Sequence, residues 1–117
     1  MQLFDQKPGV DFSKVGVLAK RSIGNAPWRF AERPMGNYAE IYWDRMKAMQ
    51  LSPSPLSWDE LAIRFSAHAP GVSCALLGTS SPAHLTAAAR SVELGPLEAS
   101  TLARVRAAFD PSWPGQV

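Results

Sequence analysis

The stretch best suited to chemistry is a short run of small residues between an apolar segment and a helical pattern. It reads Gly78-Thr79-Ser80-Ser81-Pro82. A helix N-terminus presents unpaired N–H groups and a partial positive charge, and small residues before it let an anion approach the backbone. The stretch therefore fits a phosphate site. It also fits a tight turn in which Ser81 caps the helix and Pro82 takes the first position. From this stretch alone the cap is the favoured interpretation, because caps are common and phosphate sites are few.

Other residues with chemical potential have simpler structural interpretations. Cys74 is the only cysteine, so it cannot form an internal disulfide, and its apolar neighbours predict a buried small side chain rather than a nucleophile. Ser57 and Glu60 match the S-x-x-E capping box, which accounts for the carboxylates of Asp59 and Glu60 without an acid–base role. His68 lies near the end of the following helix, where a surface position or an interaction with the helix dipole is expected.

The elements that would position these residues alternate between strand and helix. Two short apolar runs, 15–19 and 72–78, predict strands that are buried on both faces. Four segments are predicted to be helical: 38–49, the segment from Ser57 to Pro70-Gly71, the segment after Ser81, and about 98–109. This alternation favours an α/β fold with a parallel sheet. Two strands alone, however, leave sheet edges and apolar faces without cover.

Three of the helices carry apolar stripes that we expect to face inward. The stripes are Trp58, Leu61, Ala62, Phe65 and Ala69; Leu85, Ala88, Ala89 and Val92; and Leu102, Val105 and Phe109. In the first helical segment, Tyr38, Tyr42 and Trp43 have two interpretations, as the lining of a substrate pocket or as plain packing. Their helical spacing favours packing.

The length and composition of the chain limit the classes of protein to which it can belong. The chain has 117 residues, 46% of them hydrophobic and 19% charged, which predicts one globular domain over 1–117. A formal net charge of +2 without a basic cluster excludes a nucleic-acid footprint. The sequence has no apolar stretch of membrane-spanning length and no apolar signal-peptide core, so we expect no membrane association and a cytoplasmic location.

Several segments together resemble the C-terminal part of aldo/keto reductases. These are GVLAKRSIGNAPW, the IYWDRM segment, LAIRFSAHAPGVSCALLGTSSPAHL and the closing FDPSWPGQV, in this order over roughly 15–117. The resemblance implies a (β/α)₈ barrel that reduces aldehydes and ketones with NADPH. It places Val15–Ala19 as strand 7 and Ser73–Leu77 as strand 8, so the chain would form part of a TIM barrel.

The resemblance also implies a binding site for the nicotinamide cofactor. Arg21, Ser22, Ile23 and Gly24 would lie along its pyrophosphate. Gly78, Thr79 and Ser80 would lie by the 2′-phosphate of its adenosine, with His84 on the first turn of the helix behind.

Two positions depart from the family pattern at this site. Many family members have an arginine where His84 stands and an asparagine where Ala88 stands. The resemblance makes NADP the expected cofactor, and these two departures leave NAD as the alternative.

No residue of the chain corresponds to the catalytic tetrad of the family, so we expect the chain alone to be inactive and to need a missing N-terminal half. Another interpretation stays open, a non-catalytic nucleotide-binding or oligomerising remnant that pairs its sheet edges with another chain. A truncated reading frame without a folded product also stays open. The sequence does not identify a substrate.

Overall fold

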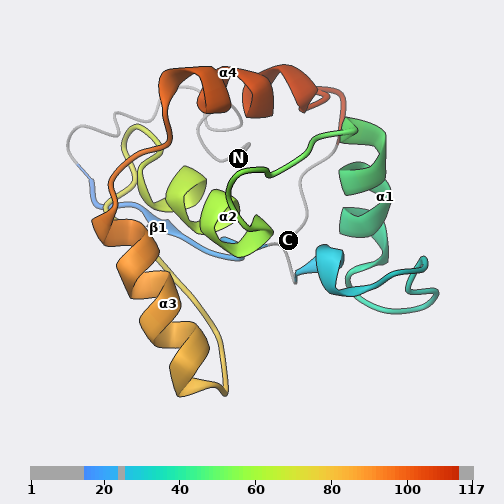
Figure 1. Cartoon of the computed structure of the whole chain (residues 1–117), viewed down its shortest axis with the longest axis horizontal. Coiled ribbons are helices and arrows are strands. Elements are labelled where there is room, and N and C mark those ends of the chain that lie inside the picture. Colours follow the sequence, from blue (N-terminus) through green and yellow to red (C-terminus); the bar gives the residue numbers. More distant parts are fainter. Residues whose placement is uncertain (1–14, 24–25, 114–117) are drawn as a thin grey trace.

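The described part of the chain, 15–23 and 26–113, forms an α/β arrangement of four α-helices and a two-stranded parallel sheet in a computed structural model (Figure 1). The elements in chain order are β1 (Leu18–Ala19), the 3₁₀ helix η2 (Pro27–Arg29), α1 (Glu40–Met49), α2 (Trp58–Ala67), β2 (Cys74–Ala75), α3 (Pro82–Glu93) and α4 (Ala99–Ala108). The predicted α/β class and the four predicted helices are confirmed. Among these helices, none combines the length and apolar character needed to cross a membrane.

The two strands pair in parallel, as predicted, but they are much shorter than the apolar runs that contain them. Leu18 is paired with Cys74, and Ala19 with Ala75. The Leu76 N–H donates to the Ala19 carbonyl at 2.8 Å, and the Ser73 hydroxyl accepts from the Val17 N–H at 3.1 Å. In the described sheet each strand has only one neighbouring strand. The length of each strand is therefore limited to the few residues over which β1 and β2 run side by side.

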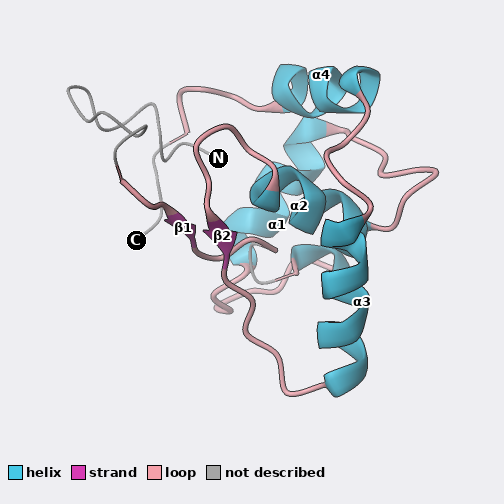
Figure 2. Cartoon of the chain, turned by 90° about the vertical axis from the view of Figure 1, so that its left-hand side faces the viewer, coloured by secondary structure: helices cyan, strands magenta, loops and turns pink. Residues whose placement is uncertain are grey.

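The sheet is covered on one face only, and the prediction of strands buried on both faces is wrong. Val17 is 7% exposed, whereas Leu18 is 61% and Leu76 is 47% exposed. Leu18 and its partner Cys74 point to the same face as Leu76, because successive side chains alternate across a strand. The helices lie to one side of the strands (Figure 2), and α2 packs against β2. The expectation of a buried Cys74 is wrong for the same reason, since its side chain is exposed on the uncovered face.

The main hydrophobic cluster lies between α2 and the C-terminal segment rather than on the sheet. Its buried members are Leu61 of α2, Leu97, and Val105 of α4. Half-buried residues pack around them: Leu51, Leu56, Trp58, Phe65 and Leu102. The inward stripes predicted for α2 and α4 are therefore confirmed at their central residues. Ile63 of α2 is also buried, although it lies outside the predicted stripe.

Helix α3 packs on α2, but only part of the predicted stripe is covered. Leu85 is 54% exposed and Ala89 is exposed, while Ala88 and Val92 are half-buried. The inward placement predicted for Leu85 and Ala89 is wrong. Among the described elements, α3 packs mainly on α2, so part of its apolar stripe stays exposed to solvent.

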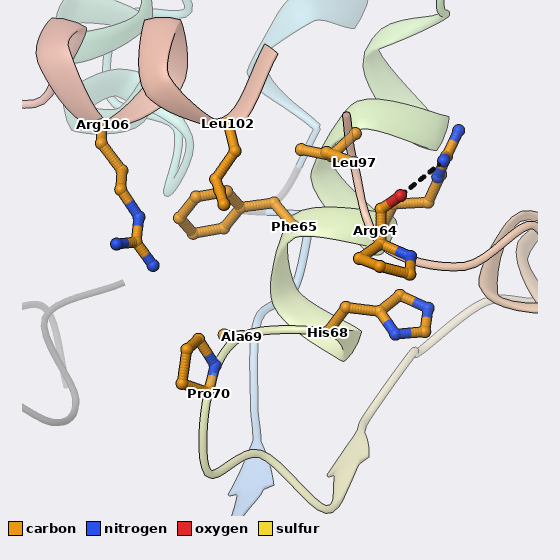
Figure 3. Close-up of a pocket in the computed structure, with 9 residues that line it drawn as sticks. Arg64, Phe65, His68, Ala69, Pro70, Leu97, Leu102 and Arg106 are labelled. Carbon is orange, nitrogen blue, oxygen red and sulfur yellow. Dashed lines mark hydrogen bonds between the residues drawn. The ribbon is translucent and has the colours of Figure 1, made fainter. Parts of the chain in front are cut away.

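The end of α2 is tied to the connection between α3 and α4. The Arg64 guanidinium donates to the carbonyls of Gly95 and Pro96 at 2.9 and 2.8 Å. His68, the exposed C-cap of α2, contacts the Val92 carbonyl through Nε2 at 2.9 Å. These contacts border a hollow of about 30 Å³ (Figure 3), into which Phe65 points toward Leu102. That volume suits about one water molecule, so the hollow belongs to the packing of α2 on α4. The surface position predicted for His68 is confirmed.

Candidate functional site

A cleft between α2 and α3 brings together several of the residues predicted to bind the cofactor. Its volume is about 200 Å³. The lining residues are Ser57, Asp59, Glu60 and Ile63 at α2, Leu77, Gly78 and Thr79 after β2, His84, Ala87, Ala88 and Ser91 on α3, and Ile23 after β1. The loop after β2 runs alongside α3 to the N-terminal end of that helix (Figures 1 and 2), and Gly78, Thr79 and His84 from these two segments line the cleft.

Four predicted site residues line this cleft: Ile23, Gly78, Thr79 and His84. They come from segments more than fifty residues apart in the chain, and the parallel pairing of β1 with β2 brings them together. Carboxyl ends of parallel strands meet at one edge of a sheet, and this edge is where ligands bind in open α/β proteins. The cleft therefore lies where the fold favours a site.

The Gly78–Pro82 loop is organised as a helix cap. The Ser81 hydroxyl accepts from the His84 N–H at 3.3 Å, and Pro82 occupies the first helical position. The Ser81 N–H donates to the Thr79 hydroxyl at 3.1 Å. This confirms the cap that the sequence favours. The Thr79 hydroxyl accepts in this contact, so its O–H remains a donor for another group.

Gly78 leaves open space beside the loop. A Cβ built at this position meets no atom within 4 Å, and the backbone is not in the left-handed region. Packing within the chain therefore does not require a glycine here. Gly78 lines the cleft, so a larger side chain at position 78 tests whether a ligand contacts this part of the lining.

Of the other predicted site residues, the described ones, Arg21, Ser22 and Ser80, lie outside the cleft lining. Ser80 is exposed next to Thr79, and Gly24 lies outside the described residues. Ser22 is buried, and its hydroxyl lies 3.4 Å from the Ala19 carbonyl and 3.3 Å from the Leu76 carbonyl. That hydroxyl therefore links the ends of the two strands.

Arg21 is directed toward the aromatic residues at the start of α1. Its guanidinium lies over the Tyr38 ring at 4.9 Å and hydrogen bonds to the hydroxyls of Tyr38 and Tyr42. The hydrogen bond with Tyr42 contributes most to raising the pKa of Arg21 above its usual value. The backbone of Arg21 has φ 56°, a conformation that non-glycine residues adopt rarely. Tyr38 and Tyr42 thus anchor the loop after β1, and Trp43 Nε1 donates to the Phe30 carbonyl at 3.1 Å.

Two carboxylates of the cleft were not expected from the sequence as site residues. Asp59 and Glu60 lie in the first turn of α2, where Ser57 accepts from the Glu60 N–H at 3.1 Å, as the capping box predicts. The packing of α3 on α2 turns this first turn toward the Gly78–Thr79 loop. The S-x-x-E pattern is visible in the sequence, but its proximity to residues about twenty positions later is not.

The side chains that line the cleft are better suited to accepting hydrogen bonds from a ligand than to binding an anion. Asp59 and Glu60 supply acceptors, Ser57, Thr79 and Ser91 supply hydroxyls, and Ile63, Leu77 and the alanines of α3 supply apolar wall. Over the described residues, 15–23 and 26–113, no group of three or more His, Cys, Asp and Glu side chains could hold a metal ion. The arrangement fits part of a polar organic ligand with an apolar ring.

Comparison of the chain with protein-family models, with curated proteins and with solved structures found no match.

Proposed function

We propose that the chain is the C-terminal part of an aldo/keto reductase barrel and that its cleft holds the adenosine end of a nicotinamide dinucleotide. The observation that carries the proposal is the convergence of Ile23, Gly78, Thr79 and His84 on one cleft at the carboxyl end of the sheet. The sequence resemblance assigns these residues to the cofactor. Their convergence depends on the fold and is independent of the motifs.

The one-sided sheet supports the barrel part of the proposal. Parallel sheets in open α/β folds carry helices on both faces, whereas the strands of a barrel carry helices outside and side chains packed inside. Leu18, Cys74 and Leu76 share the uncovered face, and the helices lie on the other. In a barrel these three side chains would face the interior.

The size of the cleft supports a partial ligand site. Pockets for whole small-molecule ligands usually measure about 300–1,000 Å³, and this cleft measures about 200 Å³. It suits an adenosine group rather than a whole dinucleotide. The bound cofactor supplies the hydride, while the residues of this chain bind and orient its distant end. The resemblance gives the chain no counterpart of the catalytic tetrad, so we expect no reductase turnover from the chain alone.

A ligand titration with matched glycine variants tests the proposal. Adenosine 5′-monophosphate and NADP⁺ are titrated into the ¹⁵N-labelled chain, and shifts of the amide signals are followed. We expect the largest shifts at Gly78, Thr79 and His84. Gly78→Val is expected to abolish them with an unchanged thermal melt, because a Cβ there meets open space. Gly16→Ala is the control, since its Cβ meets only the Ser73 hydroxyl at 3.8 Å, away from the cleft. Shifts that persist in Gly78→Val would contradict the proposed site.

The uncovered sheet face favours the second candidate, an oligomerising remnant without catalysis. Leu18 is 61% exposed and Leu76 is 47% exposed, and each strand of the described sheet has one edge without a partner strand. Natural sheets usually cover such edges. Light scattering after size-exclusion chromatography distinguishes the candidates. A stable oligomer that dissociates in Leu18→Lys, without any nucleotide, supports the remnant, and a monomer excludes it.

A further inference from the structure

The charge of the cleft indicates which form of the cofactor it accepts. Asp59 and Glu60 are its acidic side chains, and no lysine or arginine among the described residues lines it. Arg64 forms an ion pair with one of these carboxylates, and its Nη1 lies 3.8 Å from Glu60 Oε2. That guanidinium also donates to the Gly95 and Pro96 carbonyls, so its donors are directed away from the cleft. The site therefore presents two carboxylates that are only partly compensated.

NAD and NADP differ at one position of the adenosine ribose. NAD carries a 2′-hydroxyl, which can donate a hydrogen bond to a carboxylate, whereas NADP carries a 2′-phosphate, which a carboxylate repels. An acidic side chain that accepts from the 2′-hydroxyl selects NAD in other dinucleotide sites, and an arginine accommodates the phosphate. The hydroxyls of Thr79 and Ser57 fit either ligand and do not discriminate.

We infer that the cleft selects NAD over NADP and that Asp59 is the specificity-determining residue. The inference rests on the proposed function and deepens it. Asp59 is the residue to which we assign the discrimination, because Glu60 is paired with Arg64 while the exposed Asp59 lines the cleft beside the Thr79 loop. Among the described residues, no lysine, arginine or histidine forms an ion pair with Asp59. The expected preference for the unphosphorylated ribose is at least about tenfold in affinity at low salt.

The test compares two small probes that differ only in the 2′-phosphate. Adenosine 5′-monophosphate and adenosine 2′,5′-bisphosphate are titrated into the full chain by calorimetry at pH 8 and fixed ionic strength. We expect the monophosphate to bind at least about tenfold more tightly, and we expect this affinity ratio to fall as salt is added. Asp59→Asn keeps the size of the side chain and should lower the ratio, and Asp59→Lys should reverse the preference. Glu32→Gln removes an exposed carboxylate outside the cleft and should leave the ratio unchanged.

The outcomes separate this inference from the proposed function. Equal or tighter binding of the bisphosphate would overturn the NAD selectivity and leave the nucleotide site standing. An unchanged ratio in Asp59→Asn, or the same change in Glu32→Gln, would overturn the role of Asp59. Binding of neither probe would overturn both the nucleotide site and the selectivity that rests on it.

Discussion

Replacing Leu61 with alanine should destabilise the chain far more than replacing Leu85, although both lie on stripes that the sequence predicts to face inward. Leu61 is 4% exposed in the cluster with Leu97 and Val105, and Leu85 is 54% exposed. A buried leucine truncated to alanine costs about 2–5 kcal/mol. Half-buried neighbours border this cluster and can relax into the space, so we expect about 2–3 kcal/mol for Leu61→Ala. Leu85→Ala should change stability by at most about 0.5 kcal/mol.

Urea unfolding followed by far-UV circular dichroism measures both values under the same conditions. If Leu61→Ala leaves too little folded chain for a baseline, Ile63→Val is the milder probe, because Ile63 is 3% exposed and loses one methylene. That variant should cost about 1 kcal/mol. A cost for Leu85→Ala equal to that for Leu61→Ala would refute the reasoning, since it would mean that the outer side of α3 is buried in solution.

Three further outcomes follow from local contacts. Arg33 hydrogen bonds to Asp44 at 2.7 Å and holds the pKa of Asp44 below its usual range. The stability from this pair is therefore present near neutral pH and is lost as the pH falls through the lowered pKa, and the difference between the chain and Asp44→Asn in thermal melts should vanish in acid. Ser57→Ala removes the cap on the Glu60 N–H and should cost about 1 kcal/mol in urea unfolding. Cys74 should react with iodoacetamide in the native chain within about tenfold of its rate in urea, and strong protection would show that the sheet face is covered.

The parts of the fold that the sequence predicts correctly depend on short-range contacts. Ser57 with Glu60 and Ser81 with His84 form caps between residues three apart, so the pattern itself specifies the hydrogen bond. The order of elements also favours the parallel pairing, because parallel neighbours need a long crossover connection and the helices between β1 and β2 supply one.

The sequence could not predict which apolar faces are covered or which polar groups meet. Leu18, Leu76 and Leu85 are apolar and periodic, yet burial also requires a neighbouring element, and the described chain supplies none on those sides. Arg21 contacts Tyr38 and Tyr42, about twenty residues later, and no short-range pattern in the sequence indicates this contact.

The sequence by itself determined the α/β order of elements. It also determined the starts of α2 and α3 and the small-residue loop at Gly78–Pro82, because these depend on side chains within one turn of each other. Only the tertiary structure decided that Asp59 and Glu60 face the Thr79 loop, because that contact depends on how α3 packs on α2. A capping motif specifies where a helix begins, and the packing of neighbouring helices specifies what its first turn faces.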